Sequence, residues 1–194
     1  MRLAGLMRPA TLAIVFLAGA TKLDGQNLIR NGNFESFAGN EPKFWNTTNI
    51  PKILDVVTPV TRSHGGKYAV KCEVKDFHGS KMPGMITQKD IAISATALQF
   101  KGYYVLNSVG KDEGFISIEL QDDEGNTVKI CQENLAGPAP AFTQFSMAGD
   151  VPPRAVKLDI KMTLLPGKGS ENLHEGSYIL LDDLELVPVK QEGH

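Results

Sequence analysis

The residue types that most often do chemistry in proteins occur in this chain without the spacing that a catalytic motif requires. The four histidines, His64, His78, His174 and His194, form no HExxH motif, and none has a cysteine at zinc-binding spacing. A GxSxG nucleophile motif and a phosphate-binding loop are also absent from the sequence. The 22 acidic residues allow many carboxylate pairs of the glycosidase kind, but nothing selects one pair. No sequence feature therefore supports an enzyme.

Two aromatic residues on otherwise polar strand faces are the candidates for ligand binding. Tyr103 lies among polar neighbours in an alternating segment over 97–107, and Phe115 begins the next such segment. An aromatic ring on a polar strand face is typical of a binding surface, although single exposed aromatics are also ordinary. We expect the two rings to lie on neighbouring strands. The candidate contact residues are Tyr103, Phe115, Lys101, Glu119 and Gln121.

The segments that carry these residues are predicted to be β-strands. Apolar residues alternate with polar ones at a period of two, as in Ile116, Ile118 and Leu120, and no long helical period appears. Turn-forming glycines and prolines separate the segments. About ten short strands with turns between them indicate an all-β, antiparallel β-sandwich of the jelly-roll kind in a single domain. The expected strands are 27–30, 52–57, 67–75, 84–91, 97–107, 115–121, 126–133, 141–148, 156–163 and 177–188.

Composition limits the class of partner. The 194 residues are 42% hydrophobic and carry a formal net charge of −2, which excludes intrinsic disorder and argues against nucleic-acid binding. Residues 1–20 combine two arginines, a short apolar run and small residues at the exit, which is the pattern of a secretory signal peptide cleaved after Ala20. The apolar run is shorter than the about 20 residues that span a membrane. We therefore expect export to the periplasm, the cell surface or the medium without membrane insertion, a sandwich over 26–189 and a polar tail over 190–194.

Export makes the two cysteines informative. Cys72 and Cys131 would meet an oxidising compartment, where a disulfide bridge between them can form and persist. The alternative is two separate buried thiols, which are common in protein cores. The sequence leaves both alternatives open.

Three motifs in a fixed order carry a family resemblance. The chain reads NLIRNGNFE over 27–35, SHGGKYAVK over 63–71 and YILLDDLEL over 178–186. This order resembles the carbohydrate-binding modules of the family 4/9/22 type, which are galactose-binding-like jelly rolls, and the resemblance covers essentially the whole chain after the signal segment. It implies a non-catalytic protein that binds polysaccharide or oligosaccharide chains on a concave sheet face or in a loop cleft.

The resemblance also implies a structural calcium ion where the first and last segments meet. Carried over by position, Glu35 and Asp182 would be side-chain ligands, and Asn33 and Lys67 would contribute carbonyl oxygens. Asp182 shares its strand face with Leu180, and a carboxylate buried on such a face needs a partner or a cation. Calcium accepts this mixture of oxygen ligands. The alternative is that Asp182 pairs with a lysine or accepts backbone N–H groups, and this chain has His64 where some relatives place an acid.

Two other functions remain alternatives. One is a structural or adhesion sandwich without sugar binding, whose partners would be other extracellular proteins. The other is a small jelly-roll polysaccharide lyase, for which Tyr103 with Lys101 could act as base and charge neutraliser.

Overall fold

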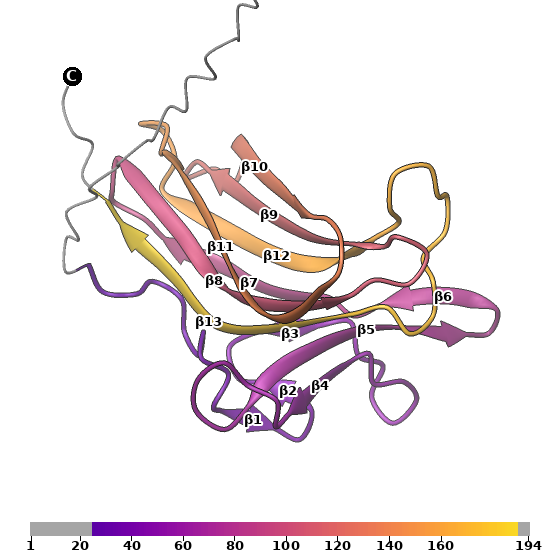
Figure 1. Ribbon diagram of the computed structural model, residues 1–194. Coiled ribbons are helices and arrows are strands. Elements are labelled where there is room, and N and C mark those ends of the chain that lie inside the picture. Colours follow the sequence, from indigo (N-terminus) through magenta and orange to yellow (C-terminus); the bar gives the residue numbers. More distant parts are fainter. Residues whose placement is uncertain (1–24, 190–194) are drawn as a thin grey trace, which may run out of the picture.

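The computed structural model describes residues 25–189, and this part of the chain is all-β (Figure 1). The expected signal segment and polar tail lie outside the described residues. Within them, no helix is long and apolar enough to cross a membrane. The strands are β1 (Phe37–Ala38), β2 (Glu41–Pro42), β3 (Asn46–Thr47), β4 (Val57–Val60), β5 (Ala69–Phe77), β6 (Ser80–Pro83), β7 (Ile86–Ala92), β8 (Ala97–Asn107), β9 (Glu113–Gln121), β10 (Thr127–Leu135), β11 (Ala139–Asp150), β12 (Lys157–Leu165) and β13 (Tyr178–Pro188).

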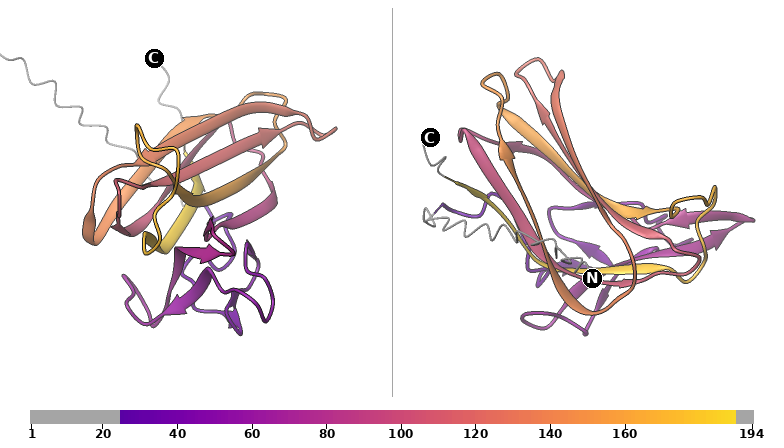
Figure 2. Two further views of the ribbon diagram at one scale, coloured as in Figure 1. Left: turned by 90° about the vertical axis from the view of Figure 1, so that its right-hand side faces the viewer. Right: turned by 45° about the horizontal axis from the view of Figure 1, so that its top comes forward.

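Two antiparallel sheets pack face to face, which confirms the predicted β-sandwich. One sheet has the strand order β10-β9-β12-β7-β3, and we call it the β9 sheet. The other has the order β11-β8-β13-β5-β4, with β6 paired to β5, and we call it the β8 sheet. Figure 2 shows the two sheets as arms of a V that diverge toward one end. Consecutive strands such as β8 and β9 therefore belong to opposite sheets.

The inner faces of the two sheets form one apolar core, as the period-two alternation predicts. Ile116, Ile160 and Met162 from the β9 sheet are buried in the same cluster as Phe100 and Leu181 from the β8 sheet. Trp45 belongs to this core as well: its ring centroid lies 5.5 Å from that of Phe34, and its indole N–H donates to the carbonyl of Asn31.

The segment over 27–30 is not a strand, but it follows the last strand closely. The N–H of Leu28 donates to the carbonyl of Leu186, and the N–H of Leu184 donates to the carbonyl of Gly32. A Cβ at Gly32 would lie only 2.2 Å from the Leu184 carbonyl oxygen, so this approach needs glycine. The first and last segments of the domain therefore lie side by side, as the family resemblance implies.

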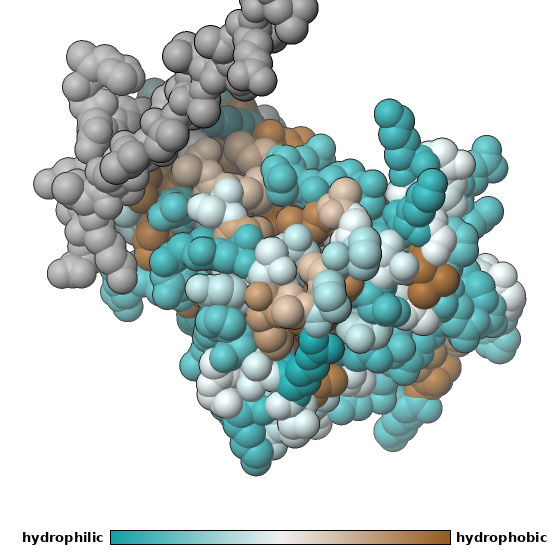
Figure 3. All heavy atoms as spheres, viewed as in Figure 1, coloured by the Kyte–Doolittle hydropathy of each residue, from teal (hydrophilic) through white to brown (hydrophobic). Residues whose placement is uncertain are grey.

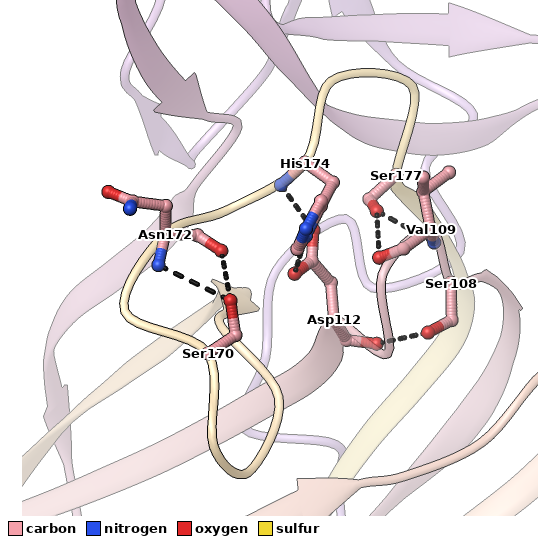
Figure 4. Close-up of polar contacts among 7 residues, drawn as sticks. All are labelled: Ser108, Val109, Asp112, Ser170, Asn172, His174 and Ser177. Atoms are coloured by element: carbon pink, nitrogen blue, oxygen red, sulfur yellow. Dashed lines mark hydrogen bonds and ion pairs between the residues drawn. The ribbon is translucent and has the colours of Figure 1, made fainter.

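A polar network joins two of the connections between the sheets (Figure 4). The buried Asp112, in the β8–β9 connection, accepts the backbone N–H of His174 at 2.8 Å and lies 3.0 Å from His174 Nδ1. The hydroxyl of Ser177 accepts the N–H of Val109 at 3.0 Å. These bonds fix the β12–β13 connection against the β8–β9 connection, and so hold both sheets at this end of the sandwich.

The two cysteines are free thiols, so the structure does not contain the disulfide that the sequence allowed. Cys72 is buried on β5 in the β8 sheet, and Cys131 is half-buried on β10 in the β9 sheet. The second alternative, two separate thiols, describes this structure.

Candidate functional site

A row of polar side chains crosses all five strands of the β9 sheet on its outer face. The strand register pairs Gln132 with Ser117, Ser117 with Lys161, Lys161 with Thr87, and Thr87 with Asn46. Neighbouring strands are about 4.8 Å apart, so this row extends over about 19 Å. It runs across the strands and reaches both edges of the sheet.

The rows on either side complete a mixed polar surface. Phe115 pairs with Thr163 in one row, and Glu119 pairs with Asp159 in the other. Like charges directly opposite each other destabilise a sheet, so the fold gains no stability from this carboxylate pair. Glu119 accepts a hydrogen bond from the hydroxyl of Thr127, and Asp159 accepts the backbone N–H of Asp90 at 2.8 Å.

This face is hollowed into a shallow groove. A hollow of about 500 Å³ is lined by side chains of four neighbouring strands, namely Asn46, Thr87, Lys89, Ser117, Glu119, Asp159 and Lys161, together with Met85 and Ile160. We call this hollow the β9-sheet groove. Its volume lies within the range usual for ligand sites.

Several polar side chains in the groove make no hydrogen bond to another of the described residues. Ser117 is 8% exposed, yet its hydroxyl makes no hydrogen bond within residues 25–189. The side chains of Asn46 and Thr87 likewise make none in the described part of the chain. No buried side-chain nitrogen or oxygen of residues 25–189 lacks a hydrogen-bond partner, so the polar atoms of these three side chains are accessible to solvent. A ligand in the groove can therefore replace water as the hydrogen-bond partner of these side chains.

Some of the charged side chains on this face of the β9 sheet are balanced by an ion pair. Lys157 Nζ lies 2.7 Å from Asp90 Oδ1, and the hydrogen bond from Lys157 holds the pKa of Asp90 below its ordinary value. Lys161 stands 5.9 Å from the centroid of the Phe115 ring, which is within cation–π range. The groove thus combines cations, carboxylates and hydroxyls, and the Phe115 ring lies beside it on the same sheet face.

The structure separates the five predicted contact residues. Phe115, Glu119 and Gln121 share the outer face of β9, as predicted, but Tyr103 and Lys101 lie on β8 in the other sheet. The expectation that the two rings lie on neighbouring strands was wrong, because the chain crosses from one sheet to the other between β8 and β9. Parity along one strand cannot reveal such a crossing.

Tyr103 and Lys101 are already engaged where they lie. The imidazole of His64 stacks on the Tyr103 ring at 3.5 Å with 12° between the planes, and Phe142 meets His64 edge-on. Lys101 Nζ lies 2.9 Å from Glu185 Oε2. One face of the Tyr103 ring is therefore covered, and neither residue lines the β9-sheet groove.

Two of the predicted calcium ligands, Asp182 and Glu35, contact one loop over 64–68, which also contains Lys67. Asp182 is fully buried and accepts the N–H groups of His64 at 2.7 Å, Gly65 at 3.1 Å and Asp183 at 2.8 Å. Burial raises the pKa of Asp182 above its ordinary value, and its backbone hydrogen bonds oppose that rise. The alternative that Asp182 accepts backbone N–H groups is thus what the structure shows.

Glu35 is held by the same loop and is exposed. Its Oε1 accepts the N–H groups of Lys67 and Tyr68 at 2.8 and 2.9 Å. A carboxylate oxygen accepts two hydrogen bonds, so Oε2 of Glu35 and one lone pair of Asp182 Oδ1 remain available. Asn33 lies two residues before Glu35 and is exposed. The described residues contain no cluster of three or more acidic, histidine or cysteine side chains that could hold a metal, so the calcium ion stays a prediction that rests on these two carboxylates and on backbone carbonyls.

A second hollow lies between the sheets rather than on a face. It measures about 290 Å³ and opens between β10 and β11, with an apolar floor that includes Leu98, Phe100 and Leu120. Figure 3 shows apolar residues gathered in this region, surrounded by polar ones. Its floor belongs to the core and offers a sugar few hydrogen-bonding groups.

Sequence reasoning missed the residues that make the groove continuous. Ser117, Lys161, Thr87 and Asn46 were not predicted as a set, although Lys161 lies on the polar side of an alternating segment. The signal that could have found them is the strand order, which places β12 between β9 and β7. The residues of a single strand do not reveal that order.

The fold is that of the jelly-roll sandwiches to which carbohydrate-binding modules belong. No family model matches the chain, and no curated protein matches it. Among solved structures, the chain is similar to the module TmCBM61 in complex with β-1,4-galactotriose, with 17% identity and a TM-score of 0.52 over 84% of this chain and 99% of that one. It is also similar to the xylan-binding CBM22-1 domain of Paenibacillus barcinonensis, with 15% identity and a TM-score of 0.53 over 86% and 97%.

A larger protein shares the fold as well. The enzymatically active domain of tailspike protein 4 from bacteriophage CBA120 aligns with 18% identity and a TM-score of 0.57 over 84% of this chain. The chain spans about a fifth of that structure, as 21% is covered. At these identities the comparisons show a common fold.

Proposed function

We propose that this chain is an exported, non-catalytic carbohydrate-binding module that binds polysaccharide in the β9-sheet groove. The observation that carries the proposal is the polar row from Gln132 to Asn46, in which the solvent-accessible side chains of Ser117, Thr87 and Asn46 make no hydrogen bond to another described residue. Sugar hydroxyls both donate and accept, so a sugar chain lying across the strands can satisfy this row.

The chemistry of the groove supports a sugar over an apolar ligand. Carboxylates at Glu119 and Asp159 accept from hydroxyl groups, while Lys161 and Asn46 donate to them. Phe115 supplies one ring against which a sugar face can pack. Because the row reaches both sheet edges, a chain can extend beyond the groove in either direction.

Binding is tested by affinity electrophoresis of residues 21–194 through gels that contain soluble β-glucan, xylan, mannan or galactan. We expect retardation by at least one polysaccharide. Ser117→Trp, which fills the groove, should abolish the retardation. The matched control is Gln144→Trp on the exposed outer face of β11, which should leave it unchanged.

A melting curve for each variant separates loss of binding from loss of folding. If Ser117→Trp unfolds, the double variant Asn46→Ala/Thr87→Ala removes two groove side chains without adding bulk. Retention on cells or on partner proteins, with no retardation by any polysaccharide, would favour a structural or adhesion protein. Release of unsaturated products from an acidic polysaccharide would favour a lyase.

We propose further that calcium stabilises the junction of the first and last segments. The Glu35 and Asp182 carboxylates with the Asn33 and Lys67 carbonyls would hold the ion, which would neutralise the buried Asp182 and cross-link the segments. The support is the pairing of both carboxylates with one loop over 64–68. A chelator should lower the melting temperature of calcium-loaded protein, and Glu35→Gln should reduce that sensitivity.

A further inference from the structure

Two lysines stand in the β9-sheet groove without a carboxylate partner. Lys161 on β12 and Lys89 on β7 are exposed, and among residues 25–189 neither forms an ion pair. Lys157, on the same strand as Lys161, is by contrast paired with Asp90. Lys161 lies opposite Thr87, and Lys89 follows two residues later on the same face, so the two lysines are diagonal neighbours.

The groove carboxylates are less accessible than these cations. Glu119 and Asp159 are half-buried, whereas Lys161 and Lys89 are exposed. One oxygen of each carboxylate already accepts a hydrogen bond, from Thr127 or from the backbone of Asp90. The remaining oxygen suits a hydroxyl donor. A ligand entering the groove therefore meets the two exposed ammonium groups first and the half-buried carboxylates and hydroxyls beneath them.

Covering these lysines with a neutral ligand costs desolvation free energy. An ammonium group that loses its water needs a hydrogen bond of equal strength in the complex, and a sugar hydroxyl forms a weaker one with it than a carboxylate does. Lys161 stands in the middle of the polar row, so a chain that bonds to Ser117 and Thr87 must also cover it. An anionic group on the ligand turns this desolvation cost into a charge-assisted hydrogen bond.

We propose that the groove binds an acidic polysaccharide, with the carboxylate of a uronic acid unit held between Lys161 and Lys89. The hydroxyls of the same unit bond to Ser117, Thr87 and the two groove carboxylates. This inference rests on the proposed function and adds the chemical class of the ligand to it.

The test compares ligands in which a carboxylate is either free and charged or neutralised as its methyl ester. Calorimetry measures the binding of oligosaccharides from polygalacturonate, alginate and glucuronoxylan, each as the free acid and as its methyl ester. For at least one pair, the acid should bind about tenfold or more tightly than the ester, as expected for a charge-assisted contact. The preference should shrink as salt is raised, because both lysines are exposed.

Variants locate the preference in the groove. Lys161→Met keeps the apolar stem and removes the charge, so it should abolish most of the preference while ester binding persists. Lys161→Arg should retain the preference. Lys168→Met, in the exposed β12–β13 connection and outside the groove, is the matched control and should change neither ligand's affinity.

The outcomes separate the two proposals. Equal binding of acid and ester in every pair, or a preference unchanged in Lys161→Met, would overturn the acidic ligand and leave polysaccharide binding in place. Binding of neutral chains alone would do the same. No binding of any acid, ester or neutral polysaccharide would overturn both proposals.

Discussion

The two outer faces of the sandwich use polar residues in different ways. On the β8 sheet, side chains satisfy one another: Lys101 pairs with Glu185, Lys71 pairs with Glu73, and Tyr103 is stacked by His64. On the β9 sheet, the side chains of Ser117 and Lys161 face a groove and make no hydrogen bond or ion pair within the described residues. The first arrangement stabilises the fold, and the second leaves interactions available to a ligand. We therefore expect substitutions on the β8 sheet to change stability and substitutions in the groove to change binding.

Asp182→Ala should have the largest effect on stability. The change leaves the N–H groups of His64, Gly65 and Asp183 without their acceptor. We expect a loss of about 3 kcal/mol, which is roughly 6–12 °C in melting temperature for a domain of this size. Calorimetry measures the shift, and sugar binding well below the transition should persist. Loss of binding in protein that remains folded would contradict the division between the faces.

Tyr103→Ala should show a smaller effect of the same kind. It removes the ring on which His64 stacks at 3.5 Å. We expect a loss of about 1–2 kcal/mol, or roughly 2–8 °C in melting temperature, from the lost packing and ring contact. The affinity for polysaccharide should not change. A clear drop in affinity would instead restore the sequence prediction that Tyr103 contacts the ligand.

Phe115→Ala tests the outer face of the β9 sheet, where we expect a substitution to change binding more than stability. The half-buried ring lies beside Lys161 in the β9 sheet. Its removal should weaken polysaccharide binding by about tenfold, through lost ring packing on the sugar, and lower stability by less than about 1 kcal/mol. Titration calorimetry and a melting curve on the same preparation give both numbers. If stability falls as far as in Tyr103→Ala while affinity holds, Phe115 is a packing residue.

The sequence predicts the strands of this protein better than it predicts the site. Alternation places Ile116 and Leu120 in the core and Phe115 and Glu119 outside, because a strand has only two faces. The grouping of Tyr103 with Phe115 failed because it depends on which sheet each strand joins. Long-range strand pairing, as between β9 and β12, decides which sheet a strand joins, and the alternation of residues along one strand does not reveal that pairing. The family resemblance found the meeting of Glu35 and Asp182 at one loop, which composition alone does not reveal.

The smallest expected effect concerns the two thiols, one in each sheet. Cys72 lies on β5 and is buried in the core between the two sheets. This burial raises the pKa of its thiol to about 12, so the thiol is protonated at pH 8. Cys131 is half-buried beside the opening between β10 and β11. A thiol reagent such as dithionitrobenzoate should therefore label Cys131 in the folded protein and reach Cys72 only after unfolding, because the thiolate is the reactive form. Cys131→Ser should abolish labelling of the folded chain, and Cys72→Ser should leave it unchanged. If the native protein gives no labelling until it is both unfolded and reduced, the thiols are joined in a disulfide, and the two sheets are linked through these cysteines rather than by packing alone.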